Sequence, residues 1–225
     1  MDELWTYFVE GMSGPLWEGF LASCKLIVCS VPFGLLLGFL VAVGWVYGNK
    51  PVATLCRTYV TLVKGTPLLI LLFILYFCLP TFGIMLTPFW ASVLGFILCN
   101  GAYNSEYIRG ALLSVRSGQL VAARALGMSR FEGTLFVVIP QAARRAIPGC
   151  SNELVYLIKY SSLAYMLSYV ELTGAGKMVA TRSFRFTFVF AVVGAIYLLT
   201  VSVATLLLSL VERKFSIPGF ELKRR

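Results

Sequence analysis

The chain has 225 residues, of which 59% are hydrophobic and only 13% charged, and its formal net charge is +9. A soluble domain carries about 25% charged residues, so the composition places this chain among membrane proteins. The sequence contains no histidine, which excludes imidazole metal ligands and histidine-based acid–base catalysis.

The cysteines and the first residues bear on redox chemistry and processing. No two of the six cysteines form a C-x-x-C pair, and most lie in or beside apolar runs, where a free thiol packs as a small hydrophobe. The first charged residues are Asp2, Glu3, Glu10 and Glu18, so the basic region of a signal peptide is missing. We expect no metal site and no cleaved signal peptide.

Apolar stretches along the chain predict an all-α membrane protein with five transmembrane helices and a single transmembrane domain over residues 1–225. A spanning helix needs about 20 residues. The predicted spans cover about 24–47, 57–80, 87–110, 150–171 and 186–212. The apolar core of the second, residues 66–80, is short and reaches spanning length only when it is extended backwards through residues 59–63.

The first two spans carry residues that shape helices. Gly34 and Gly38 form a G-x-x-x-G pair, a spacing that lets two membrane helices approach closely. Pro32 and Pro67 are expected to kink or start helices, since neighbouring groups in a membrane protein satisfy the carbonyls that proline frees.

The third and fourth spans carry polar residues, which are costly in a bilayer and therefore suggest function. The third ends with Asn100, Tyr103, Asn104 and Glu106. In the fourth, the residues Asn152, Glu153, Tyr156, Lys159, Ser162 and Leu163 recur at three- and four-residue spacing, with Tyr160 and Ser161 beside them. This spacing predicts one polar helix face.

Two interpretations of these polar residues stay open. A zwitterionic amino acid has a carboxylate, which Lys159 can bind, and an ammonium group, which Glu153 or Glu106 can bind. Alternatively, Glu153 pairs with an arginine or with Lys159 inside the helix bundle, or Lys159 extends to the interface.

Residues 116–140 interrupt the apolar sequence with a short basic segment. Gln119–Leu126 is rich in helix formers, and Gly127 suits the left-handed position after a helix end. Ser129 and Glu132 then match a capping box, and the second helix is expected to stop or bend by Pro140.

Three interpretations of this segment compete. It is an amphipathic segment lying on lipid headgroups, a DNA-reading helix-turn-helix, or a surface where Ala122, Ala123 and Gly127 let another protein approach closely. The flanking spans hold the segment against the bilayer, which argues against DNA binding.

Basic residues orient the spans. Fourteen of the nineteen lie between the apolar cores of spans one and two, between those of spans three and four, or after that of span five. By the positive-inside rule these regions are cytoplasmic, so the N-terminus lies outside and the C-terminus inside. The 171–187 loop, with Lys177, Arg182 and Arg185, fits this topology poorly.

The 116–140 segment resembles the EAA loop of permease subunits in type I ABC importers. The matching positions are Ala122, Ala123, Gly127, Val137, Ile139 and Pro140, while Val121 replaces the motif glutamate. The surroundings resemble the polar amino acid branch of these permeases. The similar stretches are KGTPLL (64–69), GAYNSEYIRGALLSV (101–115), IPQAARRAIP (139–148), NELVYLIKYSSL (152–163), ELT (171–173) and VERK (211–214).

The resemblance implies a non-enzymatic permease subunit in the bacterial cytoplasmic (inner) membrane. Its expected partners are a second permease, identical or related, a cytoplasmic ABC ATPase dimer that uses ATP and Mg²⁺, and an extracytoplasmic solute-binding protein. Residues implied in ATPase coupling are Val121, Ala122, Ala123, Leu126, Gly127, Met128 and Phe131. Candidate substrate-path residues are Asn100, Tyr103, Asn104, Asn152, Glu153, Lys159, Ser161 and Ser162.

The chain shows no ATPase motif of its own. The stretch ELTGAGKM (171–178) is the nearest approach to a phosphate-binding loop, but Glu171 replaces its first glycine and Met178 its Ser/Thr. A channel or an ion-coupled secondary transporter is the alternative function, although no internal repeat supports it. The missing histidine and carboxylate motifs argue against a membrane enzyme.

Overall fold

The computed structural model describes residues 11–215, and within this range the chain consists of helices and short connections without a β-strand. The helices are α2 (Ser13–Tyr47), α3 (Lys50–Gly65), α4 (Leu68–Phe73), η2 (Ile74–Cys78), η3 (Leu79–Phe82), α5 (Pro88–Ser114), α6 (Ser117–Ala125), α7 (Arg130–Gly133), η4 (Thr134–Val138), α8 (Ile139–Tyr160), η5 (Ser161–Leu167), α9 (Leu172–Ser183) and α10 (Phe186–Phe215). The acidic residues Asp2, Glu3 and Glu10 and the basic residues 223–225 lie outside the described residues.

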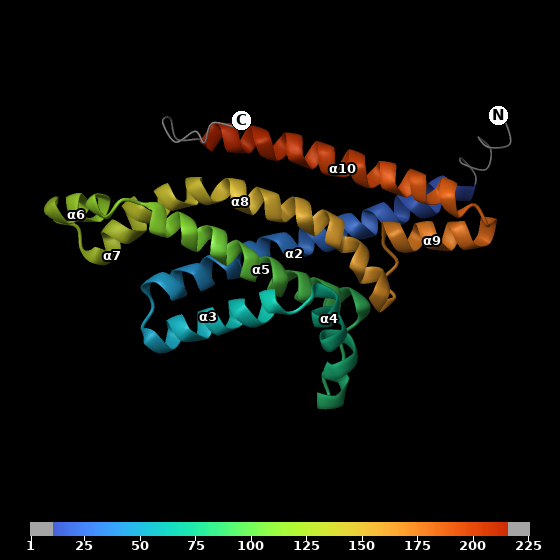
Figure 1. The fold of residues 1–225 in the computed structure, drawn as a ribbon, viewed down its shortest axis with the longest axis horizontal. Helices are drawn as coiled ribbons and strands as arrows, with labels where there is room; N and C mark the ends of the chain where they lie inside the picture. Colours follow the sequence, from blue (N-terminus) through green and yellow to red (C-terminus); the bar gives the residue numbers. More distant parts are fainter. Residues whose placement is uncertain (1–10, 216–225) are drawn as a thin grey trace.

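Four long helices, α2, α5, α8 and α10, run along the length of the molecule (Figure 1). The short helices α6 and α7 lie at one end, α9 lies at the other, and α4 projects to the side. A central core of Leu26, Leu72, Phe96, Leu157 and Leu167 joins helices from the first, second, third and fourth predicted spans. Burial of these side chains fixes the long helices against one another.

Helices α2 and α5 pack closely along a seam of small residues. A Cβ atom placed on Gly38 lies 2.8 Å from the Cβ of Asn104, and one placed on Gly34 collides with the side chain of Asn100. The predicted packing role of this glycine pair is confirmed. Because each glycine sits on an asparagine, the seam also buries two polar side chains.

The second predicted span is not one straight helix. Helix α3 ends at Gly65, and the segment Leu68–Phe82 leaves it at an angle of 105°. Thr66 is extended, with φ −105° and ψ 128°, and Pro67 caps the next helix. The residue before proline is driven out of the helical region, which explains why the chain turns here. Pro67 therefore starts a helix as expected, whereas Pro32 remains inside α2.

The count of five spans is not confirmed by length and hydropathy. Within residues 11–215, α2 and α10 are long and apolar enough to cross a membrane, and the bent pair formed by α3 and the Leu68–Phe82 segment adds a third if it counts as one span. Helices α5 and α8 have 27 and 22 residues, but they carry polar and charged side chains. Those of α5, such as Asn100, Asn104 and Ser105, are buried against other helices, whereas α8 leaves Asn152 and Lys159 exposed.

The helix that contains most of the fourth predicted span starts before that span. Helix α8 begins at Ile139, ends at Tyr160 and continues as the 3₁₀ segment η5 up to Leu167. The expectation that the preceding helix stops or bends by Pro140 agrees with the structure, because α7 ends at Gly133 and the π-helical segment η4 ends at Val138. Pro140 is the second residue of α8, in the first turn, where proline is tolerated.

Candidate translocation path and coupling surface

The turn between α6 and α7 has the local geometry that its sequence predicts. Gly127 has φ +90°, its N–H donates to the Arg124 carbonyl, and the Met128 N–H donates to the Ala123 carbonyl. This pair of hydrogen bonds is the Schellman motif that ends helices at a left-handed glycine. The direction of the chain after α6 therefore depends on Gly127.

A capping box begins α7. The Ser129 N–H donates to Glu132 Oε2 over 2.8 Å, and the Glu132 N–H donates to Ser129 Oγ over 3.2 Å. The hydrogen bond from the Ser129 backbone is the main reason that the pKa of Glu132 lies below its usual value. Because the pKa of Glu132 is lower in the folded than in the unfolded chain, its ionised carboxylate stabilises the capping box at pH values above the pKa of the unfolded chain. This contribution is lost as the pH falls through the pKa of the folded chain.

The bend presents apolar side chains to its surroundings. Val121, Leu126 and Phe131 are 67%, 84% and 73% exposed, whereas Ala123 is buried. A Cβ placed on Gly133 lies 3.3 Å from the Ala123 Cβ, so these two small residues hold α6 against α7. Of the other predicted coupling residues, Ala122 and Gly127 are exposed and Met128 is partly buried. The structure brings all seven to one end of the molecule, as a cluster with a largely apolar surface.

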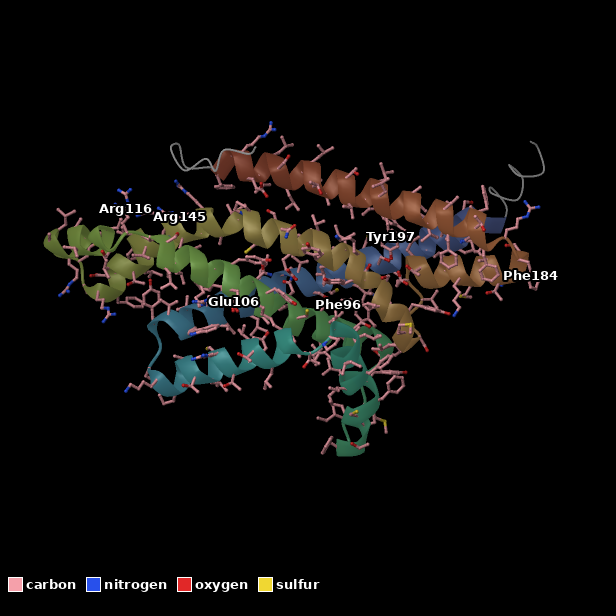
Figure 2. The ribbon with its side chains drawn as sticks, in the orientation of Figure 1. Phe96, Glu106, Arg116, Arg145, Phe184 and Tyr197 are labelled. Atoms are coloured by element: carbon pink, nitrogen blue, oxygen red, sulfur yellow. The ribbon has the colours of Figure 1, made fainter. Side chains whose placement is uncertain are left out.

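The bend is tied to the long helices. The Arg145 Nη1 of α8 donates to the Ser114 carbonyl and to Ser114 Oγ at the end of α5. Gln141 Nε2 donates to Gln119 Oε1 of α6 over 3.1 Å. Figure 2 shows Arg116 and Arg145 near this end, far from Phe184 at the opposite end. Movement of the bend is thus linked directly to α5 and α8.

A half-buried cluster of charges joins α3 and α5 near the middle of the molecule (Figure 2). Glu106 accepts from Arg109 over 2.8 Å and lies 3.5 Å from Lys64 Nζ. The Lys64 ammonium lies over the Tyr103 ring and the Arg109 guanidinium over the Trp45 ring. Such cation–π contacts hold the cations in place at partly desolvated positions. One carboxylate is therefore flanked by two cations.

The polar residues of the fourth span do not form the single face that was predicted. Glu153 is 4% exposed and points into the bundle, whereas Asn152 and Lys159 are exposed. The Lys159 ammonium lies 4.4 Å from the centroid of the Tyr156 ring, and Tyr156 stacks on Tyr160. Among the described residues Glu153 and Lys159 form no ion pair with each other, so the alternative of a Lys159–Glu153 pair gains no support.

The remaining path candidates are buried to different extents. Asn100 and Asn104 are almost completely buried in the α2–α5 seam, where Asn104 Nδ2 donates to Asn100 Oδ1 over 2.7 Å. Ser161 is buried and donates to the Ile158 carbonyl, and Ser162, which is partly buried, donates to the Lys159 carbonyl. The structure thus separates these residues into a group in the α2–α5 seam and a group on α8 and η5.

Sequence similarity decides the family. Residues 34–217 match the family described as "Binding-protein-dependent transport system inner membrane component". The chain belongs to this family. It is therefore the permease component of an ABC transport system, which favours the importer reading over a channel or an ion-coupled transporter.

Several curated relatives resemble this permease over most of its length. The octopine transport system permease protein OccM of Rhizobium meliloti is 38% identical over 213 residues, covering 88% of this chain and 87% of that protein. The putative glutamine transport system permease protein GlnP of Rickettsia conorii is 34% identical over 201 residues, covering 89% and 92%.

Solved structures share its fold. A chain of an amino acid ABC transporter crystallised with histidines has a TM-score of 0.84 and 30% identity, covering 90% of this permease and 94% of that chain. A chain of the MetNI methionine transporter in an inward-facing conformation has a TM-score of 0.79 at 19% identity, covering 92% and 99%. The all-α permease fold predicted from the sequence is confirmed.

A buried carboxylate at the start of α9 was not singled out as a site by sequence reasoning. Glu171 is completely buried and accepts hydrogen bonds from the N–H groups of Thr173 and Gly174, from the hydroxyl of Tyr197 on α10 and from that of Ser23 on α2. Its own carboxylate occupies the helix N-terminus that a nucleotide phosphate needs. The glycine-rich stretch is therefore a capped helix start rather than a phosphate loop.

Proposed function

We propose that this permease imports a polar amino acid or an amino acid derivative of the opine type. The proposal is supported by relatives named for octopine, nopaline and glutamine transport. The observation that carries it is the cluster of Lys64, Glu106 and Arg109, with buried Glu153 on the neighbouring helix. Charges of both signs lie on adjacent helices, as recognition of a zwitterion requires.

The proposed path runs along α3, α5 and α8. The substrate carboxylate binds Lys64 or Arg109 and so takes one of these two cations away from Glu106. The substrate ammonium group then binds Glu106 or Glu153. Tyr103 shares in this site because Lys64 lies over its ring. Asn152 and Lys159 on α8 and Ser162 on η5 form the rim, while Asn100, Asn104 and Ser161 position the helices around the path.

We further propose that the exposed bend of α6 and α7 docks on a cytoplasmic ABC ATPase, where ATP and Mg²⁺ are used. Val121, Leu126 and Phe131 then fill an apolar groove, and Gly127 sets the angle of approach. A second permease, identical or related, completes the translocation unit, and a solute-binding protein delivers substrate from outside. In this arrangement the N-terminus is extracytoplasmic and the C-terminus cytoplasmic, in the bacterial cytoplasmic membrane.

The charge cluster is tested by uptake in proteoliposomes that contain the permease, its ATPase and its solute-binding protein. We expect Glu106→Gln to reduce uptake by about tenfold or more, because a charge-assisted hydrogen bond contributes roughly 1.5–3 kcal/mol. The control is Glu18→Gln, which changes an exposed carboxylate on α2 and should leave uptake unchanged. Equal uptake by the two variants in assembled complexes would refute the proposed site.

A further inference from the structure

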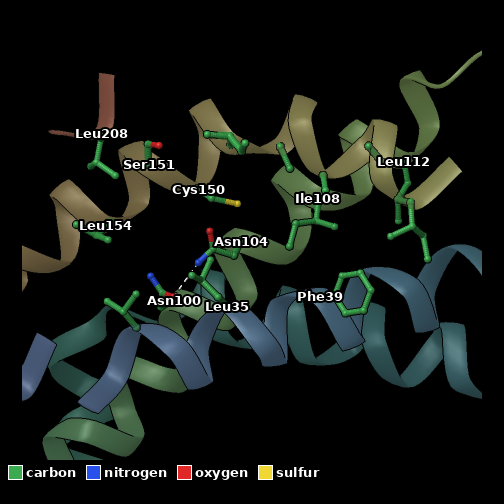
Figure 3. A pocket seen from close by; sticks show the side chains of 16 residues that line it. Leu35, Phe39, Asn100, Asn104, Ile108, Leu112, Cys150, Ser151, Leu154 and Leu208 are labelled. Atoms are coloured by element: carbon green, nitrogen blue, oxygen red, sulfur yellow. Dashed lines mark hydrogen bonds between the residues drawn. The ribbon is translucent and has the colours of Figure 1, made fainter. Parts of the chain in front are cut away.

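A cavity of about 310 Å³ lies between α2, α5 and α8, with Leu208 of α10 at its edge (Figure 3). This volume falls at the lower end of the range for small-molecule sites. Its walls are mainly aliphatic and aromatic, from residues such as Leu35, Phe39, Ile108 and Leu154. The cavity is distinct from the Lys64–Glu106–Arg109 cluster, none of whose residues lines it.

One polar atom in this cavity lacks a partner. Asn104 is completely buried, and its Oδ1 accepts no hydrogen bond from any described residue. Figure 3 shows the Asn104 side chain reaching from α5 towards Cys150 on α8, while its Nδ2 is held by Asn100. A buried acceptor without a donor costs about 1–3 kcal/mol, so a donor placed in the cavity removes this cost.

The walls select the chemistry of the occupant. A zwitterionic amino acid loses the hydration of two charges on entering and finds no ionised side chain among the lining residues. A neutral lipophilic molecule with one N–H or O–H group loses little and satisfies Asn104. We propose that this cavity binds such a molecule from the bilayer, at a site separate from the transported substrate.

Occupancy of this site has a mechanical consequence. Leu112, near the end of α5, and Ile139, the first residue of α8, both line the cavity. Helix α8 follows the α6–α7 bend through the short segment η4, so an occupant braces α8 against α2 and α5 close to that bend. The ligand is thus placed to restrain movement between the bend and the long helices.

Indole and benzofuran provide a matched pair of probes, since they have nearly the same shape but only indole has an N–H donor. We expect labelled indole to bind at one saturable site per full-length chain in lipid nanodiscs, after subtraction of empty nanodiscs. Benzofuran should compete at least about fivefold more weakly, the lower limit for leaving a buried acceptor unpaired.

Three variants locate the site. Ala143→Phe places a ring in the cavity and should abolish saturable binding, while Leu199→Phe adds the same ring to an exposed position on α10 and should not. Asn104→Leu should equalise the affinities of indole and benzofuran. If this variant fails to fold, the two phenylalanine variants and the probe comparison on the unaltered chain still decide.

The proposal is overturned by any of three results. These are absence of saturable indole binding, equal affinities of the unaltered chain for indole and benzofuran, and unchanged binding by Ala143→Phe. A cavity filled by a second permease copy or by bulk lipid produces the first of these results.

Discussion

Replacement of Gly127 by alanine tests whether the shape of the α6–α7 bend transmits energy between subunits. Gly127 has φ +90°, a conformation that costs an L-residue about 1–2 kcal/mol. A Cβ at this position meets nothing within 4 Å in the structure. The strain of Gly127→Ala is therefore purely conformational within this chain, and the native bend becomes less populated by roughly 5–30-fold.

Gly118→Ala is the matched control for this substitution. Gly118 lies in α6 with ordinary helical geometry and open space around its Cα, so alanine should be neutral or slightly favourable there. We expect both variants to insert in the membrane at normal levels. Dissociation constants for the ATPase subunit, measured on detergent-solubilised protein, should rise about 5–30-fold for Gly127→Ala alone.

Equal binding of the ATPase by Gly127→Ala and Gly118→Ala would refute a role of the bend in coupling. That result means either that alanine at position 127 does not disfavour the native conformation of the bend or that the ATPase docks elsewhere. Gly127→Asp should weaken association further if the ATPase approaches the backbone closely at this point, because the larger side chain adds a steric clash to the backbone strain. Uptake by the same variants after reconstitution into proteoliposomes shows whether lost association also means lost transport.

Three further predictions concern the span region. Lys159→Met should leave assembly intact and lower uptake by about tenfold, since a charge-assisted hydrogen bond is worth roughly 1.5–3 kcal/mol; normal uptake argues against its substrate role. Gly38→Val should destabilise the fold by about 1–3 kcal/mol, because its Cβ would lie 2.8 Å from the Asn104 Cβ; unchanged denaturation contradicts the close seam. On intact cells an impermeant thiol reagent should label Cys78 rather than Cys56, and the reverse pattern inverts the proposed topology.

Features set by neighbouring residues could be predicted from the sequence. Gly127 and the Ser129–Glu132 capping box depend on hydrogen bonds between residues a few positions apart, and both match the structure. The G-x-x-x-G pair also signalled close packing correctly. Its partner could not be foreseen, because nothing local indicates that Gly34 and Gly38 meet two asparagines of α5.

Features that depend on long-range packing could not be predicted from the sequence. The 105° turn after Gly65 follows from proline at 67, but its angle is set by how the next helices pack. Spacing placed Asn152 and Glu153 on one polar face, yet α5 buries Glu153 and leaves Asn152 exposed. Glu171 accepts a hydrogen bond from Ser23, which lies 148 residues earlier in the chain, so the ELT motif alone could not indicate that Glu171 joins α9 to α2.

The central claim is that this chain moves a polar amino acid or opine only when coupled to an ATPase and supplied by a solute-binding protein. It is tested most directly by uptake of labelled glutamine, arginine and octopine into proteoliposomes that contain the permease with its ATPase. We expect accumulation of at least one of these solutes that requires both ATP and the binding protein. Uptake by the permease alone, driven only by an ion gradient or by the solute's own gradient, would contradict it.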